Sequence, residues 1–226
     1  MLLYRLLLNP RCKEARRDLS NPYELHSTLC RAFSEPSVKC PEGTFLWRLE
    51  PEASQEEYPK ILVQSEKEPV WERIGIQNWM VQLPDLGLDL IERLKLSELT
   101  VGQKFRFRLR ANPSRIREKK RQGLLRNEDQ EQWLVRQGAA HGFKVPMLTS
   151  FEMNDLEDSQ RPDIRISQER LLRGVRHDGR SICVFSVLYD GILTVTDPIA
   201  FQKTLASGIG HGKTMGLGLL SVVPLR

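Results

Sequence analysis

Two residues suited to acid–base chemistry, Tyr23 and His26, stand three positions apart near the N-terminus. In a helix, this spacing places both side chains on one flank. The start of a helix also favours an anion, because its first amide groups are unpaired and the helix dipole is positive there. A histidine that exchanges a proton near neutrality, beside a phenol and a phosphate, suits phosphodiester transesterification. The alternative is a capped amphipathic helix whose histidine only packs at the border of its apolar face.

A glycine-rich run near the C-terminus, residues 207–214, imitates a nucleotide-binding P-loop. Ser207 stands where that motif has its first glycine, and the run follows a predicted helix instead of a strand, so we exclude ATP hydrolysis. Glycines nevertheless permit unusual backbone angles and close approach of a nucleic-acid backbone. We therefore expect nucleic-acid contacts from Gly210, Gly212 and Lys213. The alternative is a tight connection between a helix and a final strand.

The positive charge of the chain is concentrated in one stretch. Between residues 104 and 126, ten lysines and arginines stand against the single acid Glu118, while eight glutamates dominate residues 42–72. A stretch with so large an excess of basic residues favours binding to a polyanionic partner over a surface that is only solvated. The residues expected to contact a nucleic-acid backbone here are Arg115, Arg117, Lys119, Lys120 and Arg121, with Arg161 and Arg165 as additional candidates.

The remaining residue types argue against other classes of protein. The cysteines lack the C-x-x-C spacing of a zinc site, so we expect reduced thiols, no metal and no cofactor. No stretch reaches the roughly 18 to 20 apolar residues of a membrane helix, and we expect a soluble cytoplasmic protein. The four cysteines are Cys12, Cys30, Cys40 and Cys183. The scattered His141, His177 and His211 have no cysteine or carboxylate at the spacing of a metal site.

The first half of the chain predicts one mixed domain. Residues 2–8 form a strand and residues 11–17 a basic loop, and a helix then begins at Pro22 with Asn21 as its cap and Glu24 completing a capping box. Strands are expected at 44–49 and 60–65, helix within 71–96, and a strand at 104–110. In that last strand phenylalanine and leucine alternate with arginine, which predicts an apolar inner face and an arginine outer face.

The second half predicts a decorated copy of the same order. We expect a helix at 127–137, strands at 163–173 and 181–188 around the turn 177–179, a strand at 191–196, a helix capped by Asp197, and a strand at 215–223. Strand, helix, strand, strand, helix, strand is the ferredoxin-like order. The predicted fold class is therefore α+β, with two tandem ferredoxin-like (βαββαβ) domains. Their predicted bounds are 1–96, with a last strand near 104–110, and 114–226.

Three motifs in register resemble the CasE-type CRISPR endoribonucleases of the RAMP superfamily. They are Asn-Pro-Tyr-Glu-Leu-His at 21–26, Phe-Arg-Phe-Arg-Leu-Arg-Ala-Asn-Pro at 105–113, and the glycine-rich segment 208–221. The resemblance spans essentially the whole chain. It implies two ferredoxin-like domains, a role as subunit of the type I-E Cascade complex, and cleavage of CRISPR repeat RNA.

The resemblance also implies a mechanism. The family histidine matches His26, its tyrosine matches Tyr23, and its glycine-rich loop matches residues 208–218. In that family a ribose 2′-hydroxyl attacks the adjacent phosphate without a metal, leaving a 2′,3′-cyclic phosphate and a 5′-hydroxyl. We thus expect His26 and Tyr23 to be catalytic, and a repeat stem-loop and other Cascade subunits to be partners.

Three other functions stay open at this point. A non-catalytic RNA-binding subunit would share the fold and the charge. A metal-dependent nuclease is disfavoured because no acids cluster around His26 in the sequence. A purely structural subunit would use the glycine-rich end and the acidic stretch for assembly.

Overall fold

The structure, a computed structural model, describes residues 1–51, 58–150, 159–176 and 178–225. Its N-terminal sheet has four antiparallel strands in the order β2-β3-β1-β4. The strands are β1 (Leu2–Leu7), β2 (Phe45–Leu49), β3 (Lys60–Ser65) and β4 (Leu88–Asp89). The helical segments of this half are α1 (Lys13–Ser20), α2 (Pro22–Cys30), η1 (Trp71–Ile74), α3 (Leu90–Arg93) and η2 (Leu96–Glu98).

The second sheet repeats this topology with longer strands. Its main order is β11-β12-β5-β13, and β8 (Phe143–Lys144) pairs with β12. The strands are β5 (Lys104–Ala111), β11 (Ile164–Val175), β12 (Ser181–Val195) and β13 (Leu220–Pro224). The helices are α4 (Asn127–Ala140) and α5 (Pro198–Ser207), with the short η3 (Lys213–Met215) after them. Two small hairpins project from this half: β6 (Ser114–Arg117) with β7 (Lys120–Gly123), and β9 (Met147–Ser150) with β10 (Ser159–Pro162).

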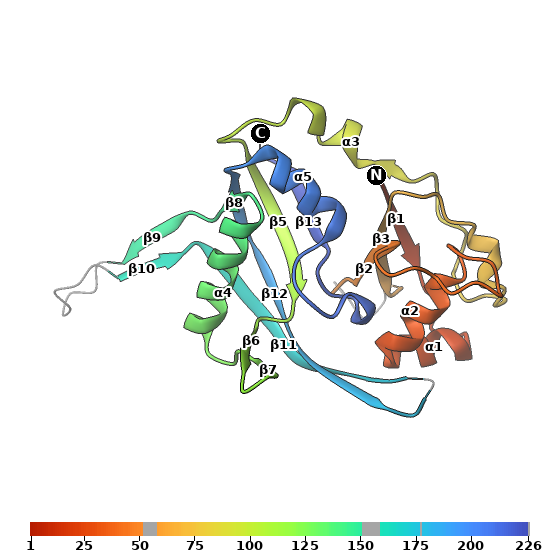
Figure 1. Ribbon diagram of the computed structural model, residues 1–226. Helices are drawn as coiled ribbons and strands as arrows, with labels where there is room; N and C mark the ends of the chain where they lie inside the picture. The colour runs from red at the N-terminus through yellow and green to blue at the C-terminus, as the bar shows by residue number, and fades with distance from the viewer. Residues whose placement is uncertain (52–57, 151–158, 177, 226) are drawn as a thin grey trace.

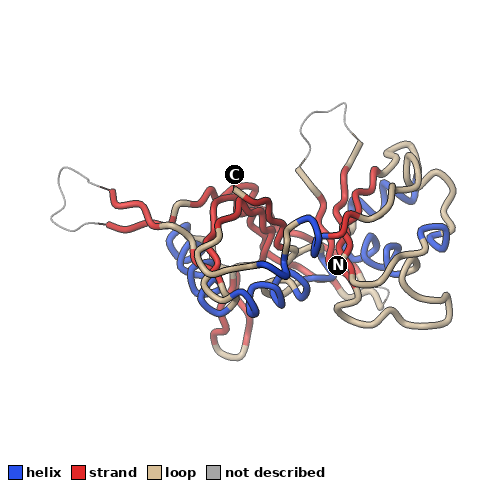
Figure 2. Tube along the Cα trace, turned by 90° about the horizontal axis from the view of Figure 1, so that it is seen from above, coloured by secondary structure: helices blue, strands red, loops and turns tan. Residues whose placement is uncertain are grey.

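Both sheets have the strand order of a ferredoxin-like fold. When the four main strands of each half are numbered 1 to 4 along the chain, their order in the sheet is 4-1-3-2, and neighbouring strands are antiparallel. The second helix of the first repeat is reduced to η1. Each half buries its own apolar cluster, one around Leu6, Trp47 and Trp79 and the other around Phe105, Tyr189 and Phe201. The predicted α+β fold is confirmed, and Figure 2 shows the N-terminus lying where the two halves meet.

The expected place of the strand near 104–110 was wrong. β5 pairs with β12 and β13, so it is the first strand of the second sheet, and the two-residue β4 closes the first. Strand periodicity reports which face is apolar but not which partner strand satisfies the backbone. We propose that the boundary between the domains lies within residues 97–103.

Several local expectations also need correction. The basic segment 11–17, expected as a loop, is largely helical because α1 begins at Lys13. Residues 191–196 continue β12 and do not form a separate strand, and the last strand begins only at Leu220. The arginine face of β5 is not uniformly outside: Arg106 is exposed and Arg108 is half-buried, whereas Arg110 is buried.

Polar side chains join the two sheets. Arg48 on β2 donates hydrogen bonds to the carbonyl oxygens of Arg108 at 3.1 Å and Leu219 at 3.0 Å. Gln64 on β3 donates to the carbonyl oxygen of Leu205 at 2.6 Å. Since Arg48 and Gln64 are both buried, these bonds fix one half against the other.

Candidate active site and nucleic-acid interface

The candidate catalytic helix α2 begins as the sequence predicts. Pro22 is its first residue, and the side chain of Asn21 accepts a hydrogen bond from the Tyr23 amide at 3.2 Å. Leu25 and Leu29 are buried under the helix, while Tyr23 and His26 are half-buried. The predicted helix start therefore holds, and both candidate catalytic side chains project from its first two turns.

His26 lies in an apolar environment at the rim of the core. Its ring packs on Phe45 with a centroid distance of 5.0 Å, and its Nε2 is 3.7 Å from the Sγ of Cys30. Its Nδ1 is buried and has no hydrogen-bond partner among the described residues. Burial lowers the pKa of His26 to about 4, because water no longer solvates the imidazolium.

This pKa changes one expectation. In the free protein His26 does not titrate near neutrality, contrary to the sequence-based prediction. At pH 7 it is a neutral imidazole, which is the form that accepts a proton. A phosphate placed beside it would raise its pKa again by favouring the cation.

An arginine that sequence reasoning missed lies over Tyr23. The guanidinium carbon of Arg176 is 6.0 Å from the centre of the Tyr23 ring, within the range of a cation–π contact. Arg176 directly follows β11, and the long β11–β12 hairpin extends below the sheet to reach α1 and α2 (Figure 1). The signal in the sequence was the series Arg170, Arg173, Arg176 and Arg180 on both sides of the turn 177–179.

The glycine-rich segment packs against the N-terminal half. A Cβ on Gly216 would lie 2.7 Å from the Trp47 ring, and one on Gly208 would lie 2.7 Å from the Gly218 carbonyl oxygen. Both have positive φ, of 75° and 72°. Close packing thus explains these two glycines without any ligand. Gly210 is different, because a Cβ there would make only ordinary contact with Trp133.

The segment 114–123 forms a basic hairpin, and all five of its predicted RNA contacts are exposed. Its two-residue turn is Glu118–Lys119, with positive φ at both positions. This hairpin approaches the glycine-rich loop: the pKa of His211 is lowered by burial first, then by the charges of Arg121 and Lys213. α2 packs against η3, which begins at Lys213. One surface therefore carries the basic hairpin, Lys213 and α2.

Arg161 and Arg165 lie elsewhere. Ile164 pairs with Gly191 at one end of β11, and Val175 pairs with Ser181 at the other, where α2 packs. Ten residues of strand separate Arg165 from Val175, which is about 33 Å at about 3.3 Å per residue. The structure thus does not bring these two exposed arginines to His26.

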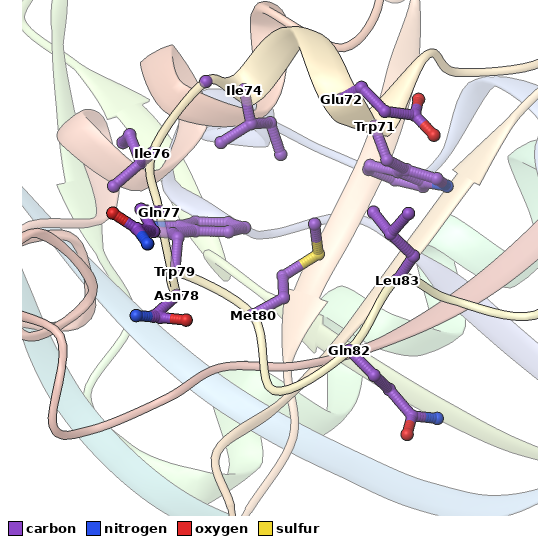
Figure 3. Close-up of a pocket in the computed structure, with 11 residues that line it drawn as sticks. Trp71, Glu72, Ile74, Ile76, Gln77, Asn78, Trp79, Met80, Gln82 and Leu83 are labelled. Carbon is purple, nitrogen blue, oxygen red and sulfur yellow. The ribbon is translucent and has the colours of Figure 1, made fainter.

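Other features of the described residues offer less chemistry. A pocket beside η1 is lined by Trp71, Trp79 and Met80 (Figure 3), with Glu72 as its one ionisable side chain. Within the described ranges, no three histidines, cysteines or acids are arranged to hold a metal ion. None of the described helices combines the length and apolar character needed to cross a bilayer. All four cysteines are free thiols, as expected, and His177 lies outside the described residues.

Comparison with known proteins agrees with this geometry. The family model described as "CRISPR associated protein" matches residues 1–224. The CRISPR-associated endoribonuclease Cse3 of Thermus thermophilus is 37% identical over 99% of this chain and 100% of its own length. The chain belongs to the CRISPR-associated proteins of the CasE/Cse3 type.

Two further relatives place the family in context. The CRISPR system Cascade subunit CasE of Escherichia coli is 32% identical over 57% of this chain and 62% of its own length. A solved structure of the endoribonuclease Cse3 bound to a 19-nucleotide RNA superimposes with a TM-score of 0.80 at 36% identity, covering 99% of this chain and 100% of that one. This CasE/Cse3-type chain therefore shares its fold, over nearly its whole length, with an RNA-bound protein.

Proposed function

We propose that this CasE/Cse3-type protein is a metal-independent endoribonuclease that binds the stem-loop of CRISPR repeat RNA and cuts it. Precursor transcripts would be cleaved into guide RNAs, which it would deliver to a Cascade complex. The observation that supports this best is the placement of His26. It is a neutral imidazole near the start of α2, beside Tyr23 and close to the arginine-rich β11–β12 hairpin. The names of its relatives, an endoribonuclease and a Cascade subunit, point the same way.

The proposed reaction uses a nucleophile that belongs to the RNA. As a base, His26 takes the proton of the ribose 2′-hydroxyl while water protonates the leaving 5′-oxygen. As an acid, after a bound phosphate has raised its pKa, His26 gives its proton to that oxygen while water takes the proton of the 2′-hydroxyl. The 2′-oxygen forms a bond to phosphorus, the bond from phosphorus to the 5′-oxygen breaks, and the products are a 2′,3′-cyclic phosphate and a 5′-hydroxyl. Tyr23 orients the ribose or the phosphate, and Arg176 stabilises the charge that develops on the phosphate oxygens.

The RNA stem would lie along the basic hairpin and the glycine-rich loop. Arg115, Arg117, Lys119, Lys120 and Arg121 would contact phosphates, and Gly210, Gly212 and Lys213 would continue the track toward α2. Duplex RNA is held mainly through its shape and phosphates, which suits exposed arginine and lysine side chains. Arg161 on β10 and Arg165 at the far end of β11 would contact only an outlying part of a longer RNA.

The decisive experiment is a cleavage assay on a labelled repeat hairpin in excess EDTA. We expect the wild type to cut and the His26→Ala variant to bind equally well but to cut about two to four orders of magnitude more slowly. A hairpin with deoxyribose at the cleavage position should bind and stay intact. Cleavage of that deoxyribose RNA, or loss of wild-type activity in EDTA, would contradict the mechanism.

A non-catalytic RNA-binding subunit is the second candidate, because the pKa of His26 in the free chain lies far from neutrality. It predicts tight binding with no product from wild type or variant. Product formation by the wild type alone rules it out.

A further inference from the structure

Arg110 on β5 is a buried cation that forms no ion pair with any acid of the described residues. Only 2% of the surface of Arg110 is exposed. Its Nη2 donates to the neutral carboxamide oxygen of Gln168, whereas its Nε and Nη1 are buried and find no partner among the described residues. The pKa of Arg110 is lowered to about 10, first by burial and then by the nearby charges of Arg170 and Arg48. Burying unpaired N–H groups on a charged side chain is costly, so such a group is typically found where a partner binds.

The carboxylates around Arg110 are already engaged by other residues. Glu50 is held by Arg48 at 2.6 Å and by Arg108 at 3.1 Å. Asp190 is held by Arg108 at 2.7 Å. Because both acids bind these other guanidinium groups, Arg110 keeps an excess positive charge.

Glu169, next to Gln168 on β11, is also engaged by another residue. The register of β11 against β12 shifts between Ser167 and Arg170, and Gln168 has a positive φ of 50°. Such an irregularity redirects side chains. Gln168 thereby reaches Arg110, while Glu169 accepts a hydrogen bond from Gln130 at 2.8 Å.

Arg110 lines a small cavity in the seam between the two halves. Arg110 and Arg170 line it together with Pro22 and Leu25 of α2 and with Gly216 beside η3. Arg170 is exposed overall, so its side chain forms the wall through which solvent or a ligand can enter. Pro22 and Leu25 belong to the turn of α2 that carries Tyr23 and His26.

We propose that Arg110 and Arg170 form a binding site for a phosphoryl anion in this seam. Two guanidinium groups offer the paired N–H donors that match phosphate oxygens, and the apolar lining from α2 and η3 strengthens that attraction by excluding water. The anion has two possible sources with one chemistry: free inorganic phosphate, or a backbone phosphate of the RNA under the proposed function. In either case the anion joins β5 to β11.

The first arm of the test measures thermal unfolding of the full chain in inorganic phosphate and in chloride at equal ionic strength. We expect phosphate to raise the Tm by about 2–4 °C more than chloride, since a ligand bound only by the folded state stabilises it. Arg170→Gln, on the exposed wall, should remove this difference without affecting folding, and Arg110→Lys should reduce it. The control Arg93→Gln, an exposed arginine on α3, should keep it.

The second arm separates the two sources. Binding of the deoxyribose-substituted repeat RNA is measured in phosphate and in chloride at equal ionic strength. If an RNA phosphate fills the site, inorganic phosphate competes and weakens RNA binding in the wild type but not in Arg170→Gln. If free phosphate fills it, RNA affinity is the same in both salts or higher in phosphate.

The proposal is overturned if phosphate and chloride give the same Tm in the wild type, or if the phosphate effect persists in both arginine variants. The first arm contains no RNA and no cleavage step. A phosphate effect without any RNA cleavage would therefore refute only the proposed function, and cleavage without a phosphate effect would refute only this site.

Discussion

The carboxamide of Asn21 pairs with the backbone of Val175 as a neighbouring strand would. Its Nδ2 donates to the Val175 carbonyl oxygen at 3.3 Å, and its Oδ1 accepts from the Val175 amide at 3.3 Å. The same Oδ1 caps α2 through the Tyr23 amide. One side chain thus starts the helix that carries His26 and fastens it to the end of the arginine-rich β11.

This double role predicts a difference between two substitutions. Asn21→Asp keeps a good helix cap but loses the donor to Val175, and its carboxylate would face a carbonyl oxygen. We expect Asn21→Asp to leave α2 folded yet to slow RNA cleavage, because Arg176 no longer holds its place over Tyr23. Asn21→Ser, which also caps but does not span to Val175, should slow cleavage in the same way. Equal cleavage by Asn21→Asp and the wild type would show that the fastening does not matter for activity.

The buried ring of His26 should make stability depend on pH. Its pKa in the folded chain, about 4, lies below the ordinary value of 6.5, so between these values only the unfolded chain binds the proton. Stability is therefore complete above about pH 6.5 and falls as the pH drops toward 4, by about 1–3 kcal/mol. Urea unfolding of the wild type and His26→Gln across this range measures it. An equally steep fall in both proteins would assign the effect to other groups.

The basic hairpin should govern how RNA binding responds to salt. Each phosphate contact contributes about 0.7–0.9 to the slope of log affinity against log salt concentration. Replacing Arg117 or Lys120 with glutamine should lower the slope by about 1 and weaken binding to all sequences alike. Lys203→Gln, an exposed change on α5, is the matched control. If the slope in the hairpin variants equals that of the wild type, the RNA binds to another surface.

Arg48 should matter for stability far more than its charge suggests. It is 1% exposed and donates to two carbonyl oxygens and to the Ser221 hydroxyl of the other half. Arg48→Met should reduce the free energy of unfolding by about 3–5 kcal/mol, because buried acceptors and Glu50 lose their partner. Arg106→Met, an exposed position on β5, should change it by less than about 0.5 kcal/mol. Denaturant unfolding of both variants compares them, and similar values would refute the bridging role.

Two glycines with nearly the same φ separate backbone strain from steric overlap. A Cβ on Gly216 (φ 75°) would overlap the Trp47 ring, whereas a Cβ on Gly179 (φ 78°) would have open space within 4 Å. We expect Gly179→Ala to cost about 1 kcal/mol and Gly216→Ala about 2–4 kcal/mol, since only the second overpacks the seam. Thermal or urea unfolding distinguishes them, and equal losses would mean that the Trp47 contact adds nothing.

The sequence by itself determined the elements and their chemistry. Asn21 and Pro22 predicted the start of α2, alternation predicted β5, and the one-sided charge marked the basic segment 115–121, whose hairpin only the structure showed. These signals are local, because capping, side-chain periodicity and charge are properties of neighbouring residues. The three motifs in register added the family resemblance, which the comparison with known proteins then confirmed.

Only the tertiary structure decided which groups meet and how deeply they are buried. It moved β5 into the second sheet, buried Arg110, placed Arg176 over Tyr23 and lowered the pKa of His26. Each of these results depends on partners that are distant along the chain. Strand pairing and desolvation arise from such long-range contacts, so the spacing of residues along a single segment does not determine them.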